Sequence, residues 1–390
     1  MEGFKRTNMT TSVSVLYIVS TLERSGPTNQ LFNLVENLGE DVKTTILTLS
    51  PEPKNTDWPR FREAGYNVQS LSLTRLKSAI YGPYRLRKKV AVVDPDLVHT
   101  QGIRADSLSA FFLTNYPRVA TVRNYPLDDY PELYGKFQGH LMARHHLCTF
   151  SRLDHPIGCS KTIADLLRQH GISAGTIQNG VNCEVFRPPA DGESLRAREE
   201  LNLSRDGPIG VSVGGLIPRK DPQTVVRGFL SSEEAIDGQL VFLGDGPLRE
   251  DCERIAADAE NIRFEGRVEE VETYLKAADY FVSASKSEGL PNAVMEALAS
   301  GLPVCLSDIP QHREILEYDH NAGVIFDVGE KSEVADQLDL LAQDNDSTRR
   351  SAARQLVENY LSANRMASQY QEIYRRIAGS SNPEKDRNVD

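Results

Sequence analysis

The stretch SKSEGLPNAVMEALASGLP, residues 285–303, decides the fold prediction for this chain. A buried strand is predicted over Tyr280–Ser283, directly before it. A helix is predicted to begin near Pro291, because the missing N–H of proline costs nothing in the first helical turn. The helix amides around residues 292–294 then point into the crevice beyond the strand end. A helix start of this kind favours a diphosphate, through its unsatisfied donors and its dipole.

Two glutamates flank this predicted helix start. Glu288 lies in the loop, and Glu296 lies about one turn into the helix. Carboxylates accept hydrogen bonds from neighbouring hydroxyl groups, so the two side chains suit opposite parts of one extended, hydroxyl-rich ligand. The competing interpretation is an exposed loop glutamate and an ordinary helix glutamate. The position beyond a strand end and the Gly-Leu-Pro-Asn spacer favour the functional interpretation.

Outward from this stretch, strands and helices alternate along most of the chain, which is typical of parallel sheets with helices on both faces. The strands are predicted over residues 13–19, 44–49, 68–73, 97–99, 118–122, 156–159, 209–213, 240–243, 262–264, 280–283, 303–306 and 323–326. Helices are predicted between them, the longest over 78–93 and 134–148. The alternation pauses near residues 179–189, and a linker is predicted over 186–192. The sequence therefore predicts two Rossmann-like, doubly wound α/β domains with a ligand site in the cleft between them.

Composition limits the class of protein. The chain has 390 residues, with 44 Lys and Arg against 55 Asp and Glu, so its net charge is −11 and general nucleic-acid binding is not expected. Its five cysteines are widely spaced, without a C-x-x-C pair, which indicates reduced thiols and no zinc site or disulfide framework. His145 and His146 are adjacent and fall on different helix faces, so no metal pair is expected. No apolar run approaches the ~18 residues of a membrane span, and we expect a cytoplasmic protein.

The 285–303 stretch, with seven residues between its two glutamates, resembles the signature of the retaining glycosyltransferases of family 4, which have the GT-B fold. The resemblance extends over most of the chain. Its other landmarks are STLERSGPTNQLFNLVENL (20–38), LVHTQGIRAD (97–106), IQNGVNCEVFRP (177–188), VGGLIPRKDP (213–222), FLGDGPLRE (242–250) and FEGRVEEVETYLKAADYFVSAS (264–285).

The resemblance implies a domain organisation. Residues 1–185 would form an acceptor-binding domain and residues 186–362 a domain for the nucleotide-sugar, the two facing across the cleft. A last helix, near 363–378, would cross back onto the first domain. The polar tail 379–390 is predicted to be disordered.

The resemblance also implies roles for individual residues. Glu288 would bind hydroxyls of the donor sugar and Glu296 the ribose, while Lys220 and Arg219 would stabilise the leaving diphosphate. Such cations are needed because a nucleoside diphosphate develops negative charge as it leaves. The remaining donor contacts would come from backbone in two loops, at Gly214, Gly215, Gly289, Leu290, Pro291 and Asn292. The alternative for Lys220 is a surface lysine beside Asp221.

This sequence departs from the family pattern at two positions. Gly215 stands where the family usually has an arginine for the diphosphate, a role that Arg219 could take over. Arg123 stands where many members have a histidine, and a guanidinium cannot act as a base. Arg123 and Asn124 would instead contact phosphate or acceptor, unless Arg123 only forms a strand-end salt bridge. Gly26 is a single glycine where the family has a glycine loop, and a simple turn is its alternative.

The function implied is a retaining transfer of sugar from a nucleotide-sugar, with a UDP-sugar favoured, to a hydroxyl of a glycan or polyprenyl-linked acceptor. Surface polysaccharide biosynthesis is the implied setting, with no metal or other cofactor. The basic run Arg85–Lys89, with Tyr125, Tyr130 and Tyr134, suggests peripheral contact with an anionic membrane, unless it is only a solvated helix face. The alternatives are a non-catalytic nucleotide-sugar-binding protein and a sugar-nucleotide epimerase, for which no convincing acid–base set is present.

Overall fold

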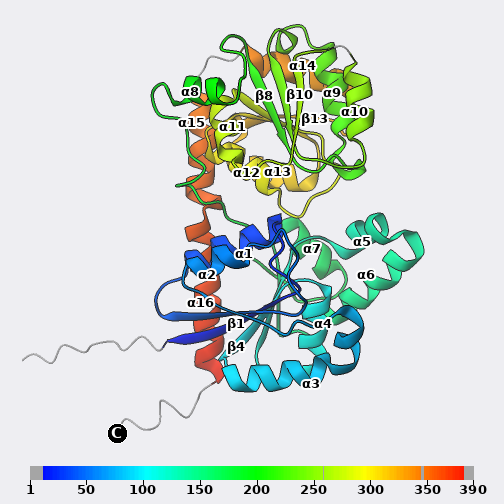
Figure 1. The fold of residues 1–390 in the computed structure, drawn as a ribbon, viewed down its shortest axis with the longest axis vertical. Helices are drawn as coiled ribbons and strands as arrows, with labels where there is room; N and C mark the ends of the chain where they lie inside the picture. The colour runs from blue at the N-terminus through cyan, green and yellow to red at the C-terminus, as the bar shows by residue number, and fades with distance from the viewer. Residues whose placement is uncertain (1–11, 258, 344–346, 382–390) are drawn as a thin grey trace, which may run out of the picture. The chain divides into compact units, whose positions relative to one another are not determined.

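The computed structural model describes residues 12–257, 259–343 and 347–381. The chain divides into two compact units (Figure 1). The first contains the chain up to Ile177 and the segment from Met366 onward, and the second contains Gln178–Arg365. The predicted divisions lie at 185/186 and 362/363. Residues 178–185, predicted for the first domain, belong to the second unit. In this segment Val181 exchanges hydrogen bonds with the far end of that unit, through Leu361 O at 2.9 Å and Ala363 N at 2.8 Å.

The first unit is built on a seven-stranded parallel sheet with the order β3-β2-β1-β4-β5-β6-β7. Its strands are β1 Val13–Val19, β2 Val42–Thr48, β3 Asn67–Ser70, β4 Leu97–Thr100, β5 Arg118–Val122, β6 His155–Gly158 and β7 Gly175–Thr176. Its helices are α1 Gly26–Glu36, α2 Trp58–Glu63, α3 Arg75–Val93, α4 Ile103–Phe112, α5 Pro126–Tyr134, α6 Lys136–Phe150, α7 Lys161–Gln169 and most of α16 Ala363–Ser381. The central strands β1, β4 and β5 are almost wholly buried, and most of their residues are apolar, as expected for a sheet covered on both faces.

The second unit has a six-stranded parallel sheet with the order β10-β9-β8-β11-β12-β13. Its strands are β8 Ile209–Val213, β9 Gln239–Leu243, β10 Ile262–Gly266, β11 Tyr280–Ser283, β12 Val304–Ser307 and β13 Gly323–Phe326. Its helices are α8 Glu193–Glu200, α9 Pro222–Ser231, α10 Arg249–Ala256, α11 Val271–Ala277, α12 Asn292–Ala299, α13 Pro310–Leu316, α14 Lys331–Ala342 and α15 Ser347–Leu356. The two units together are the two Rossmann-like sheets of the predicted fold class.

Beyond small shifts at the ends of elements, the structure differs from the prediction in its helices and in the tail. The helix predicted over 134–148 is α6, which begins at Lys136 because Gly135, with a left-handed φ of +80°, separates it from α5, a helix that was not predicted. The segment predicted as a linker contains no helix or strand, and it leads into α8, which was not predicted either. The tail prediction is wrong for its first three residues, since α16 continues to Ser381, and residues 382–390 lie outside the described part of the chain.

The last helix joins the core of the first unit. In Figure 1, α16 runs in red along the first sheet, and its side chains belong to the same apolar cluster as β1. Its polar atoms join that core as well. Tyr374 OH lies 2.6 Å from His99 Nδ1 and 2.9 Å from Tyr17 OH, and Tyr370 OH lies 2.6 Å from Thr121 Oγ1. Burial, assisted by the charge of Arg123, lowers the pKa of His99 to about 3, so its imidazole is neutral.

No described helix is long and apolar enough to cross a membrane. All five cysteines are free thiols.

The α16 network yields a stability prediction. Tyr374→Phe removes the hydroxyl that contacts both His99 and Tyr17, and leaves those buried polar atoms without this partner. We expect a loss of about 1–3 kcal/mol in the free energy of unfolding, measured by chemical denaturation. Tyr84→Phe is the control, because Tyr84 is 70% exposed on α3. Equal denaturation midpoints for Tyr374→Phe and Tyr84→Phe would contradict a contribution of the Tyr374 hydrogen bonds to stability.

Candidate functional site

A buried carboxylate held by two cations forms the centre of the candidate site in the second unit. The side chain of Glu288, in the loop after β11, is only 7% exposed. Its Oε1 lies 2.5 Å from Lys220 Nζ, and its Oε2 lies 3.2 Å from Arg219 Nη1. Burial alone would raise the pKa of Glu288, but Lys220, Arg219 and a hydrogen bond from Ser285 lower it to about 2. The carboxylate is therefore ionised at neutral pH, and the three groups together carry one net positive charge.

The two cations come from a short 3₁₀ turn, Pro218–Lys220, that is fixed against the Glu288 loop. The backbone N–H of Lys286 donates to the carbonyl of Arg219 at 2.8 Å, and Arg219 Nη1 donates to Ser287 O at 2.7 Å. The partner of Asp221 is the Lys286 ammonium, at 3.1 Å, while Lys220 turns inward to Glu288. Lys220 is thus a component of the buried cluster rather than a surface lysine paired with Asp221.

Glycines set the backbone beneath this cluster. Gly214 has a φ of +149°, and a Cβ there would lie 3.3 Å from Lys220 Cε. A Cβ on Gly244, in the loop after β9, would lie 1.9 Å from the carbonyl oxygen of Gly214. The loops after β8 and β9 therefore pack backbone against backbone. Gly215 is different, because a Cβ there would meet nothing closer than 3.6 Å, which is an ordinary van der Waals distance.

Glu296 contrasts with Glu288. It lies in α12, and its carboxylate forms no hydrogen bond or ion pair within the described residues. Burial, and then the nearby charge of Glu272, raise its pKa to about 7, while Lys220 acts in the opposite direction. A half-buried carboxylate without a partner is available to accept hydrogen bonds from ligand hydroxyls.

The segment between Glu288 and Glu296 is held by hydrogen bonds from Asn179, a residue that was not among the predicted site residues. Asn179 Nδ2 donates to Leu290 O at 3.2 Å and to Asn292 Oδ1 at 3.3 Å. Pro291 is the residue just before α12, and it provides no side-chain cap for the first amides of that helix. Gly289 and Leu290 are buried. The signal that could have identified Asn179 is its place in the quoted stretch 177–188.

His312 is a second residue that was missed. It is fully buried in α13, after β12 at the same sheet edge, with Nδ1 at 2.8 Å from Ser307 O. Burial lowers its pKa to about 4, and the charges of Glu288 and Lys220 also act on it. Its Nε2 has no hydrogen-bond partner among the described residues. The position of His312 after β12, a strand next to β11, is the one feature of the sequence that could have indicated a place near the site.

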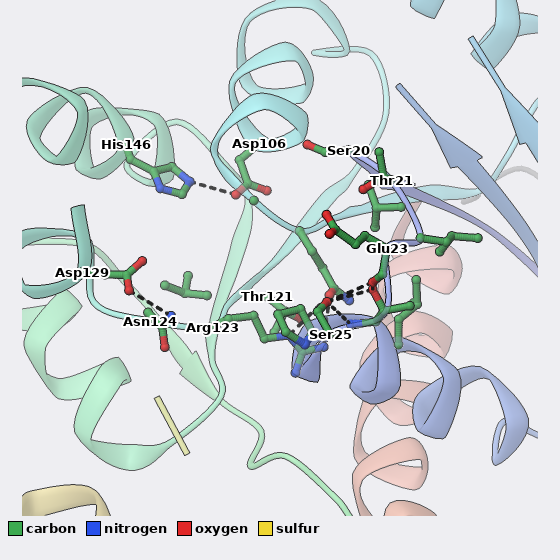
Figure 2. Close-up of a pocket in the computed structure, with 18 of the residues that line it drawn as sticks. Ser20, Thr21, Glu23, Ser25, Asp106, Thr121, Arg123, Asn124, Asp129 and His146 are labelled. Atoms are coloured by element: carbon green, nitrogen blue, oxygen red, sulfur yellow. Dashed lines mark hydrogen bonds and ion pairs between the residues drawn. The ribbon is translucent and has the colours of Figure 1, made fainter. Parts of the chain in front are cut away.

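A polar pocket of about 300 Å³ in the first unit contains the other predicted residues (Figure 2). It lies at the carboxyl ends of β1, β4 and β5. Arg123 lines it and donates through Nε and Nη2 to Gln101 Oε1, at 3.3 and 3.1 Å. Asn124 Nδ2 donates to Asp129 Oδ1 at 3.3 Å. Gly26 is the first residue of α1, and its neighbours Ser25 and Pro27 line the pocket.

The structure thus brings the predicted residues together in two groups. Glu288, Lys220, Arg219 and the loop glycines form one group in the second unit, and Arg123 and Asn124 border the pocket of the first. Across residues 12–257, 259–343 and 347–381, no three His, Cys, Asp or Glu side chains gather in a way that could hold a metal ion.

The aromatic face that the sequence suggested is not formed as expected. Tyr125 is buried, with its hydroxyl hydrogen-bonded to His170, and Tyr130 turns into the pocket. Tyr134 is exposed.

Two family models match this chain, one over most of the first unit and one within the second unit. Residues 24–185 match the family described as glycosyltransferase family 4, and residues 207–344 match glycosyl transferases group 1. The chain is 22% identical over 374 residues to the O-antigen biosynthesis glycosyltransferase WclY of Escherichia coli, covering 94% of this chain and 99% of that protein. It is 27% identical over 310 residues to the alpha-monoglucosyldiacylglycerol synthase of Streptococcus pneumoniae. That match covers 75% of this chain and 68% of the synthase.

Solved structures show the fold. The structure of Anabaena HepE in complex with UDP-glucose superposes with a TM-score of 0.78 at 14% identity, covering 93% of this chain and 99% of HepE.

The glycine geometry gives a testable contrast. Gly244→Ala places a methyl group on the backbone of Gly214 in a left-handed conformation, and we expect it to lower the free energy of unfolding by about 1–3 kcal/mol or more. Gly215→Ala, its control one loop away, meets only ordinary van der Waals distances and is expected to unfold close to wild type. The measurement is the denaturation midpoint, and a larger loss for Gly215→Ala would reject the loop packing described above.

Proposed function

We propose a specific reaction for this chain, which belongs to the group 1 glycosyltransferases of family 4. It moves a sugar from a nucleoside diphosphate sugar to a hydroxyl of a glycan or lipid-linked acceptor, with retention at the anomeric carbon. The observation that carries the proposal is the buried Glu288–Lys220–Arg219 cluster, next to the start of α12 and the unpaired Glu296.

The charges of the cluster suit the donor. In the reaction the bond from the anomeric carbon to the phosphate oxygen breaks, and negative charge grows on the leaving nucleoside diphosphate. Lys220 and Arg219 are already fixed in place, so they stabilise that charge without reorganising. The acceptor oxygen bonds to the anomeric carbon from the same side, and its proton passes to the leaving phosphate oxygen. This path needs no protein base, which accommodates an arginine at position 123.

The two glutamates take different parts of the donor. Glu288, ionised and held by cations, accepts hydrogen bonds from hydroxyls of the donor sugar. Glu296, without a protein partner, accepts hydrogen bonds from the ribose. Backbone of Gly214, Gly215 and residues 289–292 contacts the diphosphate and the sugar. No metal ion is required in this scheme, because the cations and the helix amides supply the positive charge.

The acceptor is assigned to the polar pocket of the first unit. A UDP-sugar is the favoured donor, supported by the binding of UDP-glucose by HepE, which shares this fold. Assembly of a surface polysaccharide or glycolipid is the proposed setting, supported by the activities for which WclY and the Streptococcus pneumoniae synthase are named. We further propose a cytoplasmic protein in peripheral contact with an anionic membrane, supported by the exposed basic residues of α3, Arg85, Arg87 and Lys88.

Donor binding is predicted to depend on Glu296 and on pH. The purified protein is screened by thermal shift against UDP, GDP, ADP and CDP and their sugar conjugates, where a ligand at a hundred times its Kd adds about 2.7 kcal/mol. For the stabilising sugar conjugate, affinity should rise with pH through about 7, by up to about tenfold between pH 6 and 8, because the ionised carboxylate is the better acceptor.

Two variants control this experiment. Glu296→Gln should weaken binding and flatten the pH dependence, and Glu272→Gln should move the midpoint to lower pH by removing the neighbouring charge. A stabilising nucleotide-sugar whose affinity is the same in wild type and Glu296→Gln would rule out the ribose assignment.

Turnover is predicted to depend on Lys220. Lys220→Ala should lower kcat by about 10²–10³-fold, because it removes a fixed cation from the leaving group. Lys286→Ala is the matched control, since that lysine lies in the same loop contact but pairs with Asp221 at the surface, and little change is expected. Product release is followed with an acceptor panel, the anomer is read by NMR, and EDTA should leave the rate unchanged. A product with inverted anomeric configuration, or full activity of the Lys220→Ala variant, refutes the mechanism. If the wild-type protein binds the donor but shows no turnover, the non-catalytic alternative is supported.

A further inference from the structure

A chain of hydrogen bonds ends at the wall of the pocket in the first unit. Asp106 Oδ2 lies 2.8 Å from His146 Nε2, and the other ring nitrogen of His146 lies 2.7 Å from Tyr130 OH. Thr100 Oγ1 donates to the second oxygen of Asp106 at 2.5 Å. Figure 2 shows Asp106 and His146 joined in this way at the edge of the pocket. The mechanism above uses none of these groups.

Three helices bring this hydrogen-bonded chain together. Asp106 comes from α4, Tyr130 from α5 and His146 from α6, and both Asp106 and His146 are buried. The ring of Tyr130 is parallel to that of His146, with centroids 5.8 Å apart, and Phe150 packs on His146 with its centroid 4.1 Å away. The imidazole is therefore packed against two aromatic rings as well as hydrogen-bonded at both nitrogens.

A neutral His146 would satisfy the hydrogen bonds of all three groups. A carboxylate only accepts hydrogen bonds, so a neutral ring that is protonated at Nε2 donates to Asp106. The other ring nitrogen is then an acceptor, and the phenol O–H of Tyr130 donates a hydrogen bond to it. Tyr130 thus turns its proton away from the pocket, and its oxygen offers lone pairs to a ligand.

Most of the acidic and basic side chains in the lining are carboxylates. The pocket is bordered by three carboxylates, those of Glu23, Asp106 and Asp129, against one guanidinium, that of Arg123. An anionic ligand, such as an acidic sugar or a phosphate, is repelled by such a lining, while a neutral ligand with many hydroxyl protons to donate is favoured.

From this arrangement, and resting on the proposed function, we propose that an uncharged sugar of the acceptor docks in this pocket and donates one hydroxyl hydrogen bond to the phenol oxygen of Tyr130. Tyr130 is a binding residue, and His146 and Asp106 are positioning residues that keep the phenol proton out of the pocket. Tyr130 exchanges no proton with the substrate in this assignment. Burial and the neighbouring Asp106 and Asp129 raise its pKa far above the usual range, so it remains a phenol.

The first test reads the proton positions directly in the full-length, wild-type protein. Long-range ¹H–¹⁵N correlation spectra of the histidine rings at pH 7.5 should show His146 as the neutral tautomer protonated at Nε2. Its signal is assigned with His146→Gln, and His145→Gln is the control, since that neighbouring ring is exposed. A doubly protonated His146, or one protonated only at Nδ1, overturns the positioning role, because Tyr130 would then point its proton into the pocket.

The second test uses defined sugars and needs no donor or turnover. Methyl α-D-glucopyranoside, methyl α-D-galactopyranoside and methyl α-D-mannopyranoside are titrated into the same sample, with methyl α-D-glucopyranosiduronic acid as the charged counterpart. At least one neutral glycoside should shift the ring signals of His146, and the acidic one should bind more weakly. If no neutral glycoside shifts them, or if the acidic one binds best, the proposed sugar site is wrong. The nucleotide screen above is independent of this outcome, so the two failures are distinguishable.

The third test separates binding from chemistry. With the acceptor found in the panel, Tyr130→Phe should raise the acceptor KM about fivefold, the size of one lost hydrogen bond, and leave the donor KM unchanged. Tyr134→Phe is the matched control, because that tyrosine lies on the same helix with an exposed side chain. An unchanged acceptor KM in Tyr130→Phe overturns the contact, and an equal change in donor KM shows a general structural effect instead and also overturns it.

Discussion

The reversal of strand order in each parallel sheet is the constraint on which both candidate sites depend. In the first sheet the order reverses between β1 and β4, and in the second between β8 and β11. At such a point the loops leaving two adjacent strands turn in opposite directions and leave a crevice at their carboxyl ends. The second crevice receives Lys220 after β8 and Glu288 after β11, which are 68 residues apart in sequence. The first receives Ser25 after β1 and Gln101 after β4.

The parts of the fold that could be predicted are those that depend on local pattern. Five strands, over 13–19, 118–122, 209–213, 280–283 and 323–326, have the predicted bounds, because apolar runs buried on both faces stand out from their polar ends. The separate helix α5, which precedes the helix predicted over 134–148, could not be recognised in this way. There, Gly139 lies so close to the carbonyl of Tyr130 that a Cβ would be 2.4 Å away, and that contact exists only once the two helices fold together.

In the candidate site, too, the contacts between distant segments could not be predicted from the sequence. The sequence pattern could indicate that Glu288, Glu296 and Lys220 belong together, but it could not show which carboxylate takes the cation. The structure pairs Lys220 with Glu288 and leaves Glu296 alone, so two identical side chains have pKa values displaced in opposite directions. Asn179 and His312 were missed because they lie in other segments, Asn179 in a loop and His312 in α13, and act through contacts that no spacing in the sequence encodes.

The attachment of α16 to the first unit has a consequence for the order in which the chain folds. The second unit is one continuous segment, Gln178–Arg365, so all of it has been synthesised before the first unit is complete. Tyr17 and His99 must wait for Tyr374, which follows them by 357 and 275 residues. During translation the half made first is therefore the half finished last. A nascent chain must keep an open face on its first sheet until its final helix leaves the ribosome.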